Sequence, residues 1–236
     1  MTGIRLLLAL LPALAAACGW SEGGREAAAD VQTAAPAPRP ASAPAAARPR
    51  IVFLGDSLTA GYGLARSESV PALIQARLDR EGYSYEVVNA GVSGDTSAGG
   101  VSRLDWALDG DVRILVVELG ANDGLRGLPV ENLKRNLDTI ISRAKARGIK
   151  VLLTGMEAPP NYGPAYTSAF RQVFHDLADA HDVAFVPFYL EGVAGIPELN
   201  LADGIHPNAR GARIIERTIW EALEPLLDDR ESGAGR

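Results

Sequence analysis

Apolar and polar positions along residues 50–227 alternate in blocks whose lengths fit strands and helices in turn. Apolar runs with the length of buried strands lie at 51–54, 85–89, 112–119, 149–154 and 183–187. Amphipathic stretches of helical length lie at 69–81, 97–109, 130–147, 164–181 and 208–227. This alternation favours a parallel sheet covered by helices on both faces. We therefore predict an α/β fold, a three-layer α/β/α sandwich with a five-stranded parallel sheet in the flavodoxin-like order 2-1-3-4-5.

Residues at the expected helix ends support this division. Ser69 can cap the first helical stretch, Pro71 fits its first turn and Gly82 ends it. Pro207 is expected to start the last helix.

The N-terminal residues 1–17 have the pattern of a signal peptide, which is not part of the fold. Arg5 precedes an apolar stretch that is too short to span a bilayer, which takes roughly 20 residues. Small residues, Ala15-Ala16-Ala17, fit a cleavage site after Ala17. We therefore expect export, to the periplasm or the cell envelope.

Cys18 is the single cysteine of the chain and directly follows the expected cleavage site. It resembles the acylated cysteine of a bacterial lipoprotein, with Leu14 to Cys18 as a lipobox in which Ala15 stands where Leu is usual. The alternatives are plain secretion and a cysteine discarded with the signal peptide. In every case no intrachain disulfide can form, so the domain depends on its core alone.

Residues 18–48 are rich in Ala, Pro, Arg and Gly and cannot bury enough surface to fold. Prolines bias such a segment towards extended conformations. We interpret it as a tether that joins a lipid anchor at Cys18, and with it a membrane, to a globular domain over 49–228. Residues 229–236 are expected to be a disordered tail.

Composition limits the partners. The net charge is −6 at pH 7 without a basic cluster, and aromatic residues make up 6% of the chain, so we expect no nucleic-acid partner. Clustered residues with metal-ligand spacing are absent from the sequence, so no metal and no cofactor is expected. A monomer is the expected oligomeric state.

Two polar clusters follow the first and third strands. They are Gly55-Asp56-Ser57-Leu58 and Gly120-Ala121-Asn122-Asp123. In the predicted strand order the sheet reverses between these strands, and ligands bind beyond the strand ends there. Ser57 is a candidate nucleophile if a base takes its proton, and the alternative is a helix cap. The glycine patterns of phosphate and dinucleotide sites and the G-x-S-x-G elbow are absent.

One of the three histidines is placed to act as that base. His175 and His181 fall in the helical stretch 164–181, as a helix-surface and a helix-end residue. His206 lies between the last strand and the last helix, and Asp203 precedes it by three residues, close enough to hold one imidazole nitrogen. The alternative is an Asx-turn and a polar helix start.

An acyl-transfer site also needs hydrogen-bond donors for the oxyanion. Asn122 follows a long apolar strand, where an amide is costly to bury unless its NH₂ has a partner. Gly94 offers a backbone N–H without a side chain, and the N–H of Ser57 can be a third donor. Taken singly, Asn122 and Gly94 are also typical turn residues.

Four motifs together resemble the blocks of the SGNH (GDSL) hydrolases. They are "GDSL" with Ser57, "NAGVSGDT" with Gly94, "GAND" with Asn122, and "DGIHP" with Asp203 and His206. They occur in the family's order, and the combination is highly specific, although "GDSL" alone is weak. The resemblance implies Ser57 as nucleophile, His206 as general base and Asp203 as orienting acid. It also implies an oxyanion hole formed by the N–H groups of Ser57 and Gly94 and the side chain of Asn122.

Longer stretches, "VELGANDGLRG", "PPNYG" and "DGIHPN", resemble the bacterial multifunctional thioesterase, lysophospholipase and arylesterase branch. The resemblance implies a serine esterase acting on aryl and acyl esters, lysophospholipids and acyl thioesters. It also implies that the loop 124–129 borders the acyl pocket. Ala121 departs from the pattern by replacing a common Gly, and the Ala/Pro-rich tether is additional.

Loops at the expected strand ends supply candidate substrate-binding residues. These are Leu125, Arg126, Leu128, Pro159 and Tyr162, with Pro160 and Ile196 nearby. They can line an apolar groove for a medium-length acyl chain, or they are ordinary loop packing.

Two other functions fit the same sequence. A carbohydrate acetylesterase of the envelope would use the same triad with a smaller, polar pocket. A non-catalytic envelope-binding lipoprotein would keep the fold and form no covalent intermediate at Ser57.

Overall fold

A computed structural model of the chain describes residues 48–227. The predictions of a signal peptide over 1–17, of a lipidated Cys18 and of a tether lie outside these described residues, apart from residue 48. The prediction of a disordered tail over 229–236 lies outside them as well.

Within residues 48–227, five strands form one parallel sheet in the order β2-β1-β3-β4-β5. The strands are β1 (Arg50–Gly55), β2 (Glu86–Gly91), β3 (Val112–Glu118), β4 (Lys150–Thr154) and β5 (Ala184–Val186). The register pairs Gly55 with Gly91 on one side and with Glu118 on the other, so the carboxyl ends of three strands meet at one edge. The predicted fold class and strand order are confirmed.

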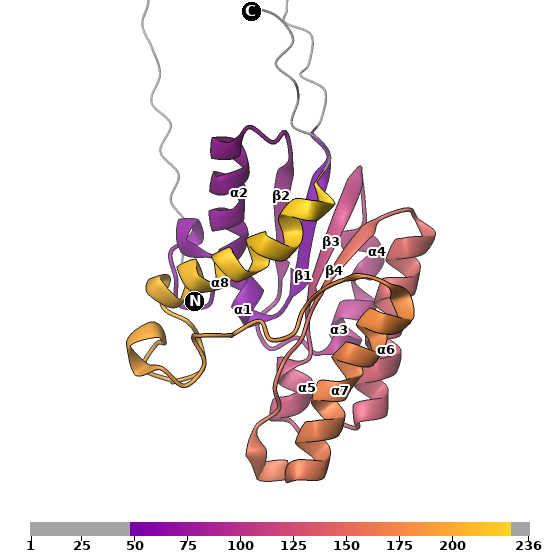
Figure 1. Cartoon of the computed structure of the whole chain (residues 1–236), viewed down its shortest axis with the longest axis vertical. Helices are drawn as coiled ribbons and strands as arrows, with labels where there is room; N and C mark the ends of the chain where they lie inside the picture. Colours follow the sequence, from indigo (N-terminus) through magenta and orange to yellow (C-terminus); the bar gives the residue numbers. More distant parts are fainter. Residues whose placement is uncertain (1–47, 228–236) are drawn as a thin grey trace, which may run out of the picture. The chain divides into compact units, whose positions relative to one another are not determined.

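Helices cover both faces of the sheet (Figure 1). On one face α2 (Val70–Glu81) packs against α8 (Ala209–Leu223). On the other, α6 (Val130–Ala146) packs against both α3 (Ser97–Ser102) and α7 (Pro164–His181). The short helices are α1 (Ser57–Ala60), α4 (Leu104–Ala107) and α5 (Ala121–Leu125), and 3₁₀ turns lie at Arg66–Glu68, Pro160–Tyr162, Pro197–Leu199 and Glu224–Leu226. No helix described here combines the length and the apolar character that crossing a membrane requires.

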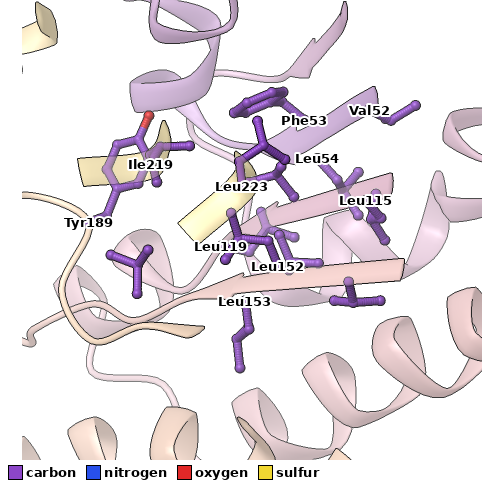
Figure 2. Close-up of a cluster of buried hydrophobic side chains, with 14 of the residues drawn as sticks. Val52, Phe53, Leu54, Leu115, Leu119, Leu152, Leu153, Tyr189, Ile219 and Leu223 are labelled. Atoms are coloured by element: carbon purple, nitrogen blue, oxygen red, sulfur yellow. The ribbon is translucent and has the colours of Figure 1, made fainter. Parts of the chain in front are cut away.

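The core lies between the sheet and these helices. The central strands β1 and β3 are buried over almost their whole length, as expected for parallel strands covered on both faces. Figure 2 shows part of this cluster, in which Phe53 and Leu115 of the strands and Ile219 and Leu223 of α8 are buried. Burial of each such side chain stabilises the fold by about 1.5–3 kcal/mol relative to its exposure to water. Together these side chains hold the strands, and with them the strand ends, in place.

The predicted helix over 97–109 is divided into α3 and α4. The division falls at Arg103, whose φ of −109° and ψ of 7° are not helical. Its guanidinium donates to the carbonyls of Gly55 (2.8 Å) and Ala90 (2.5 Å) and to the carboxylate of Asp95 (2.6 Å). Arg103 thereby binds the ends of β1 and β2 together, an interaction that helical periodicity cannot reveal.

Two helix starts also differ from the prediction. Ser69 occupies the cap position of α2, but its hydroxyl donates to the carbonyl of Arg66 (3.0 Å) and does not cap the helix. Gly82 ends α2 as predicted, with a φ of +81°. Helix α8 begins after Asn208, whose side chain accepts hydrogen bonds from the amides of the first turn, so Asn208 rather than Pro207 defines its start.

Both ends of the described segment lie at the edge of the sheet where the strands begin. Arg50 is the first residue of β1. Lys150, the first residue of β4, donates to the carbonyl of Leu226 (2.7 Å). The opposite edge, where the strands end, carries the polar clusters singled out in the sequence.

Candidate active site

Ser57 is the first residue of α1 and lies two positions after Gly55, the last residue of β1. Asp56 caps this helix, because its Oδ1 accepts a hydrogen bond from the N–H of Leu58 (2.9 Å). The alternative that Ser57 is the helix cap is therefore wrong. Gly55 allows this tight turn, since a Cβ there would lie 2.0 Å from Oγ1 of Thr59.

Ser57, His206 and Asp203 form one hydrogen-bonded chain. Nε2 of His206 lies 3.0 Å from Oγ of Ser57, and Nδ1 lies 2.8 Å from Oδ2 of Asp203. A carboxylate can only accept, so Nδ1 carries the proton and Nε2 is free to accept from the serine hydroxyl. Tyr62, which the sequence analysis did not single out, packs its ring on the imidazole with centroids 4.4 Å apart.

Asp203 is the exposed member of this chain. Its Oδ1 accepts from the N–H groups of Ile205 (2.9 Å) and His206 (3.0 Å). The His206 N–H, the Ile205 N–H and the imidazole lower the pKa of Asp203 to about 2. The same carboxylate therefore closes an Asx-type turn and orients the imidazole. The interpretation of Asp203 as an orienting acid and its interpretation as part of an Asx-turn do not exclude each other.

Ser57, Gly94 and Asn122 line one open cleft of about 460 Å³. Nδ2 of Asn122 donates one hydrogen to Oδ2 of Asp56 (3.0 Å). An amide nitrogen has two hydrogens, so one remains for an oxygen atom bound in the cleft. Gly94 has a φ of +82°, which favours glycine, and its carbonyl accepts from the guanidinium of Arg126 (2.8 Å).

Two buried carboxyl groups lie beneath the turn that carries Ser57. They belong to Asp56 and Glu118, both 0% exposed. Burial, opposed by hydrogen bonds from Leu58 and Asn122, raises the pKa of Asp56 to about 6. Burial, and then the charge of Asp56, raises the pKa of Glu118 well above its ordinary value. The sequence analysis assigned neither residue a role; the available signal was an acid at the end of an apolar strand.

A second hydrogen-bond network, which the sequence analysis did not predict, holds α5, the short helix that contains Asn122. The N–H and the hydroxyl of Ser97 donate to the buried carboxylate of Asp123 (2.8 and 2.6 Å). The amide of Asn136 donates to Oγ of Ser97 (2.9 Å). These bonds connect α5 with α3 and α6, so the residue next to Asn122 is fixed from two helices.

The other two histidines do not line the cleft. His181 ends α7, as predicted, and contacts Asp138 (2.7 Å). His175 was predicted on a helix surface, but it is half-buried because its ring packs on the edge of Phe185, with centroids 5.0 Å apart. Within residues 48–227 no group of three or more His, Cys, Asp or Glu side chains is arranged to hold a metal ion.

The predicted substrate-binding residues divide into two groups. Leu125 and Pro159 line the cleft itself. Arg126, Leu128 and Tyr162 lie outside its lining and support its wall. The Tyr162 hydroxyl donates to the carbonyl of Leu125 (3.1 Å), and the Leu128 carbonyl accepts from a tyrosine hydroxyl of α7 (2.8 Å).

Apolar lining residues that the sequence analysis did not name come from other loops. They are Tyr62, Met156, Leu190 and Ile205. Ile196, which was named, borders a separate hollow of about 320 Å³. The lining is discontinuous in sequence, which is why spacing alone did not find it.

Comparison with known proteins agrees with this geometry. Residues 53–214 match the GDSL-like Lipase/Acylhydrolase family. The chain belongs to this family. The prediction of an SGNH (GDSL) hydrolase is thus confirmed, and the matched segment contains all five residues of the candidate triad and oxyanion hole.

Individual known proteins are similar to this chain over most of its length. Esterase TesA of Pseudomonas aeruginosa is 46% identical over 183 residues, which cover 77% of this chain and 91% of that protein. Thioesterase 1/protease 1/lysophospholipase L1 of Escherichia coli is 39% identical over 185 residues, 78% of this chain and 88% of that protein. The crystal structure of a TesA superposes with a TM-score of 0.73 at 46% identity, over 75% of this chain and 99% of that one.

Proposed function

We propose that this protein is a serine esterase that hydrolyses carboxylic esters through an acyl-enzyme on Ser57. The observation that carries the proposal is the contact chain from Asp203 through His206 to Ser57 at a cleft that Gly94 and Asn122 also line. The similarity to esterases and to a thioesterase/lysophospholipase supports the same reaction class.

In the proposed mechanism, the hydroxyl of Ser57 attacks the ester carbonyl while Nε2 of His206 takes its proton. The carbonyl oxygen becomes an oxyanion and accepts from the N–H groups of Ser57 and Gly94 and from the second amide hydrogen of Asn122. His206 then gives its proton to the leaving alcohol. A water molecule, deprotonated by His206, releases the acid and restores Ser57.

Asp203 supports this cycle from outside the cleft. Each proton transfer makes His206 a cation for a moment, and the carboxylate 2.8 Å from Nδ1 stabilises that cation. Since the pKa of Asp203 is about 2, the carboxylate is ionised throughout the neutral range.

The lining of the cleft favours esters with a longer acyl chain over acetyl esters as substrates. Leu125, Met156, Pro159 and Leu190 give it an apolar wall that a short acetyl group leaves unfilled. We propose lysophospholipids and aryl or acyl esters as substrates, with acyl thioesters as chemically equivalent ones. The alternative, a carbohydrate acetylesterase, would be expected to have a smaller and more polar pocket.

Hydrolysis of p-nitrophenyl esters from acetate to palmitate tests the proposal. The full chain is assayed beside Ser57→Ala, with a fluorophosphonate probe to label the nucleophile. A maximum at medium chain lengths that disappears in the variant, together with labelling at Ser57, supports the proposal. Activity on acetate alone favours the acetylesterase. A folded wild-type protein without turnover or labelling favours the non-catalytic lipoprotein.

We further propose that the protein is exported and anchored through an acylated Cys18, with a monomeric domain on the tether. The support is the order of signal peptide, lipobox and Ala/Pro-rich segment in the sequence. Metabolic labelling with an alkyne fatty acid in a bacterial host tests it. Incorporation that is lost in Cys18→Ser supports anchoring, whereas an unlabelled protein released from the cells contradicts it. Sedimentation of the detergent-solubilised chain measures its oligomeric state.

A further inference from the structure

Glu118 is the last residue of β3, and the hydrogen bonds that its carboxyl group accepts from residues 48–227 all reach one oxygen. Oε2 accepts from the N–H of Asp56 (3.3 Å) and from the N–H and hydroxyl of Thr59 (3.2 and 2.8 Å). These donors belong to the turn that contains Ser57. The carboxyl group therefore holds the nucleophile's backbone from beneath the sheet edge.

The other oxygen of Glu118 is in a different situation. Oε1 is buried and has no hydrogen-bond partner within residues 48–227. The carboxyl of Asp56, which is also fully buried, accepts at both of its oxygens, from Leu58 and from Asn122. Of the four oxygens in this pair, Oε1 is thus the one without a hydrogen to accept.

Within residues 48–227, no Lys, Arg or His side chain forms an ion pair with Glu118. The hydroxyl of Tyr189, drawn in red in Figure 2, is buried nearby and neutral, and Asp56 is a second acid. Arg103 donates to the carbonyl of Gly55, and its charge is paired with Asp95 at 2.6 Å. His206 acts on Asp56 from the cleft side. Two ionised carboxylates in this buried space would repel each other, and the hydrogen bonds to them would offset only part of that repulsion.

We propose that Glu118 is a positioning residue that stays protonated on Oε1, so that the Asp56–Glu118 pair carries one negative charge, on Asp56. A neutral carboxylic acid still accepts at Oε2 and so keeps the turn of Ser57 in place. The directions of the two pKa shifts agree, since the pKa of Glu118 lies well above its ordinary value and that of Asp56 is about 6.

The catalytic consequence rests on the proposed esterase function. The single charge of Asp56 orients the amide of Asn122 towards the position of the oxyanion. A second charge on Glu118 would add repulsion to the oxyanion that forms above the same turn. Holding Glu118 neutral removes that repulsion and retains all three hydrogen bonds to the turn.

Difference infrared spectra at neutral pH test where the proton lies. We expect the C=O stretch of a protonated carboxylic acid in the wild type, in the surface control Glu131→Gln and in Asp56→Asn, and its loss in Glu118→Gln. Absence of the band from the wild type overturns the proposal. Loss of the band in Asp56→Asn with retention in Glu118→Gln also overturns it, because the proton would then lie on Asp56.

Kinetics of the same variants test the positioning role. Glutamine copies a neutral glutamic acid, so Glu118→Gln should keep kcat within about threefold of the wild type, while Glu118→Ala leaves the turn's donors unpaired and should lose about tenfold or more. Equal losses in both folded variants overturn the proposal. If Glu118→Ala does not fold, Glu118→Gln and the infrared band still decide. An inactive wild type would refute the esterase function and leave the infrared result intact.

Discussion

Asp203 and Asp56 are the same residue type on two sides of Ser57, and their pKa values move in opposite directions. Asp203 lies in an open loop, where hydrogen bonds from two backbone N–H groups and the imidazole lower its pKa to about 2. Asp56 lies under the sheet edge, where burial outweighs its hydrogen bonds and raises its pKa to about 6. The environment, rather than the residue type, decides which effect dominates.

The difference separates two tasks in one site. In the proposed mechanism, the exposed side, with Asp203 and His206, carries the charge that forms and is lost during each proton transfer. The buried side, with Asp56, Glu118 and Asn122, holds the turn of Ser57 and the amide of Asn122 in position. The effects of substitutions on the two sides should therefore differ in magnitude, and they should differ in whether kcat or stability changes.

The largest effect is expected where the two sides meet. Ser57→Ala and His206→Ala should each lower kcat by about 10⁴- to 10⁶-fold, and the double variant should be little worse, because these residues act as a unit. Initial rates on a medium-chain p-nitrophenyl ester measure this. Losses that multiply in the double variant would show that the two residues act independently.

The next effect belongs to the exposed side. Asp203→Asn should lower kcat by about 10⁴-fold at neutral pH, because an amide no longer selects the tautomer with Nε2 free. The thermal midpoint should hardly change, since an exposed pair contributes little stability. Calorimetry and rate measurements on one preparation check both parts. A large fall in stability would mean that the loop depends on this contact.

A smaller effect is expected on the buried side. Asn122→Ala should lower kcat by about 10²–10³-fold through loss of one oxyanion donor. Asp56→Asn should lower it by about tenfold, since it weakens the contact that orients that donor. In both variants KM should stay close to the wild-type value. If KM rises and kcat is unchanged, Asn122 binds the ground state instead.

The smallest effect concerns stability rather than rate. The pKa of Glu118 in the folded state lies above its ordinary value of 4.5. Its contribution to stability is therefore full below pH 4.5, and it is lost as the pH rises from 4.5 through the folded-state pKa. Relative to Glu118→Gln, the wild type should lose about 1.4 kcal/mol of unfolding free energy per pH unit in that window. Denaturant titrations at several pH values measure the slope, with Glu131→Gln as control. Parallel curves for wild type and Glu118→Gln would contradict it.

Sequence reasoning reached the residues that line the cleft more completely than the buried carboxyl groups beneath them. Ser57, Asn122 and His206 each follow an apolar strand, and parallel strands bring their carboxyl ends to one edge, so their meeting could be predicted. Glu118 ends an apolar strand too, but its partners Asp56 and Thr59 lie about sixty positions away and contact it only after folding. Burial of a carboxyl group depends on tertiary packing, and no local pattern encodes it.

The helix boundaries repeat this lesson. Leu133, Leu137 and Ile140 repeat with helical spacing, so α6 was predicted almost to the residue. The division between α3 and α4 depends on what Arg103 contacts on two strands, which periodicity does not contain. The same holds for the cleft, where Met156 and Leu190 come from segments without a common motif.

The start of β1 and the end of the last 3₁₀ turn lie at the edge of the sheet opposite Ser57, the latter next to Lys150. For anyone coupling this domain to a bead, an electrode or a second protein, either end serves as the attachment point. The support then faces the edge where the strands begin, and the cleft faces the solution. Bulky lipid assemblies can reach the immobilised enzyme without passing its linker.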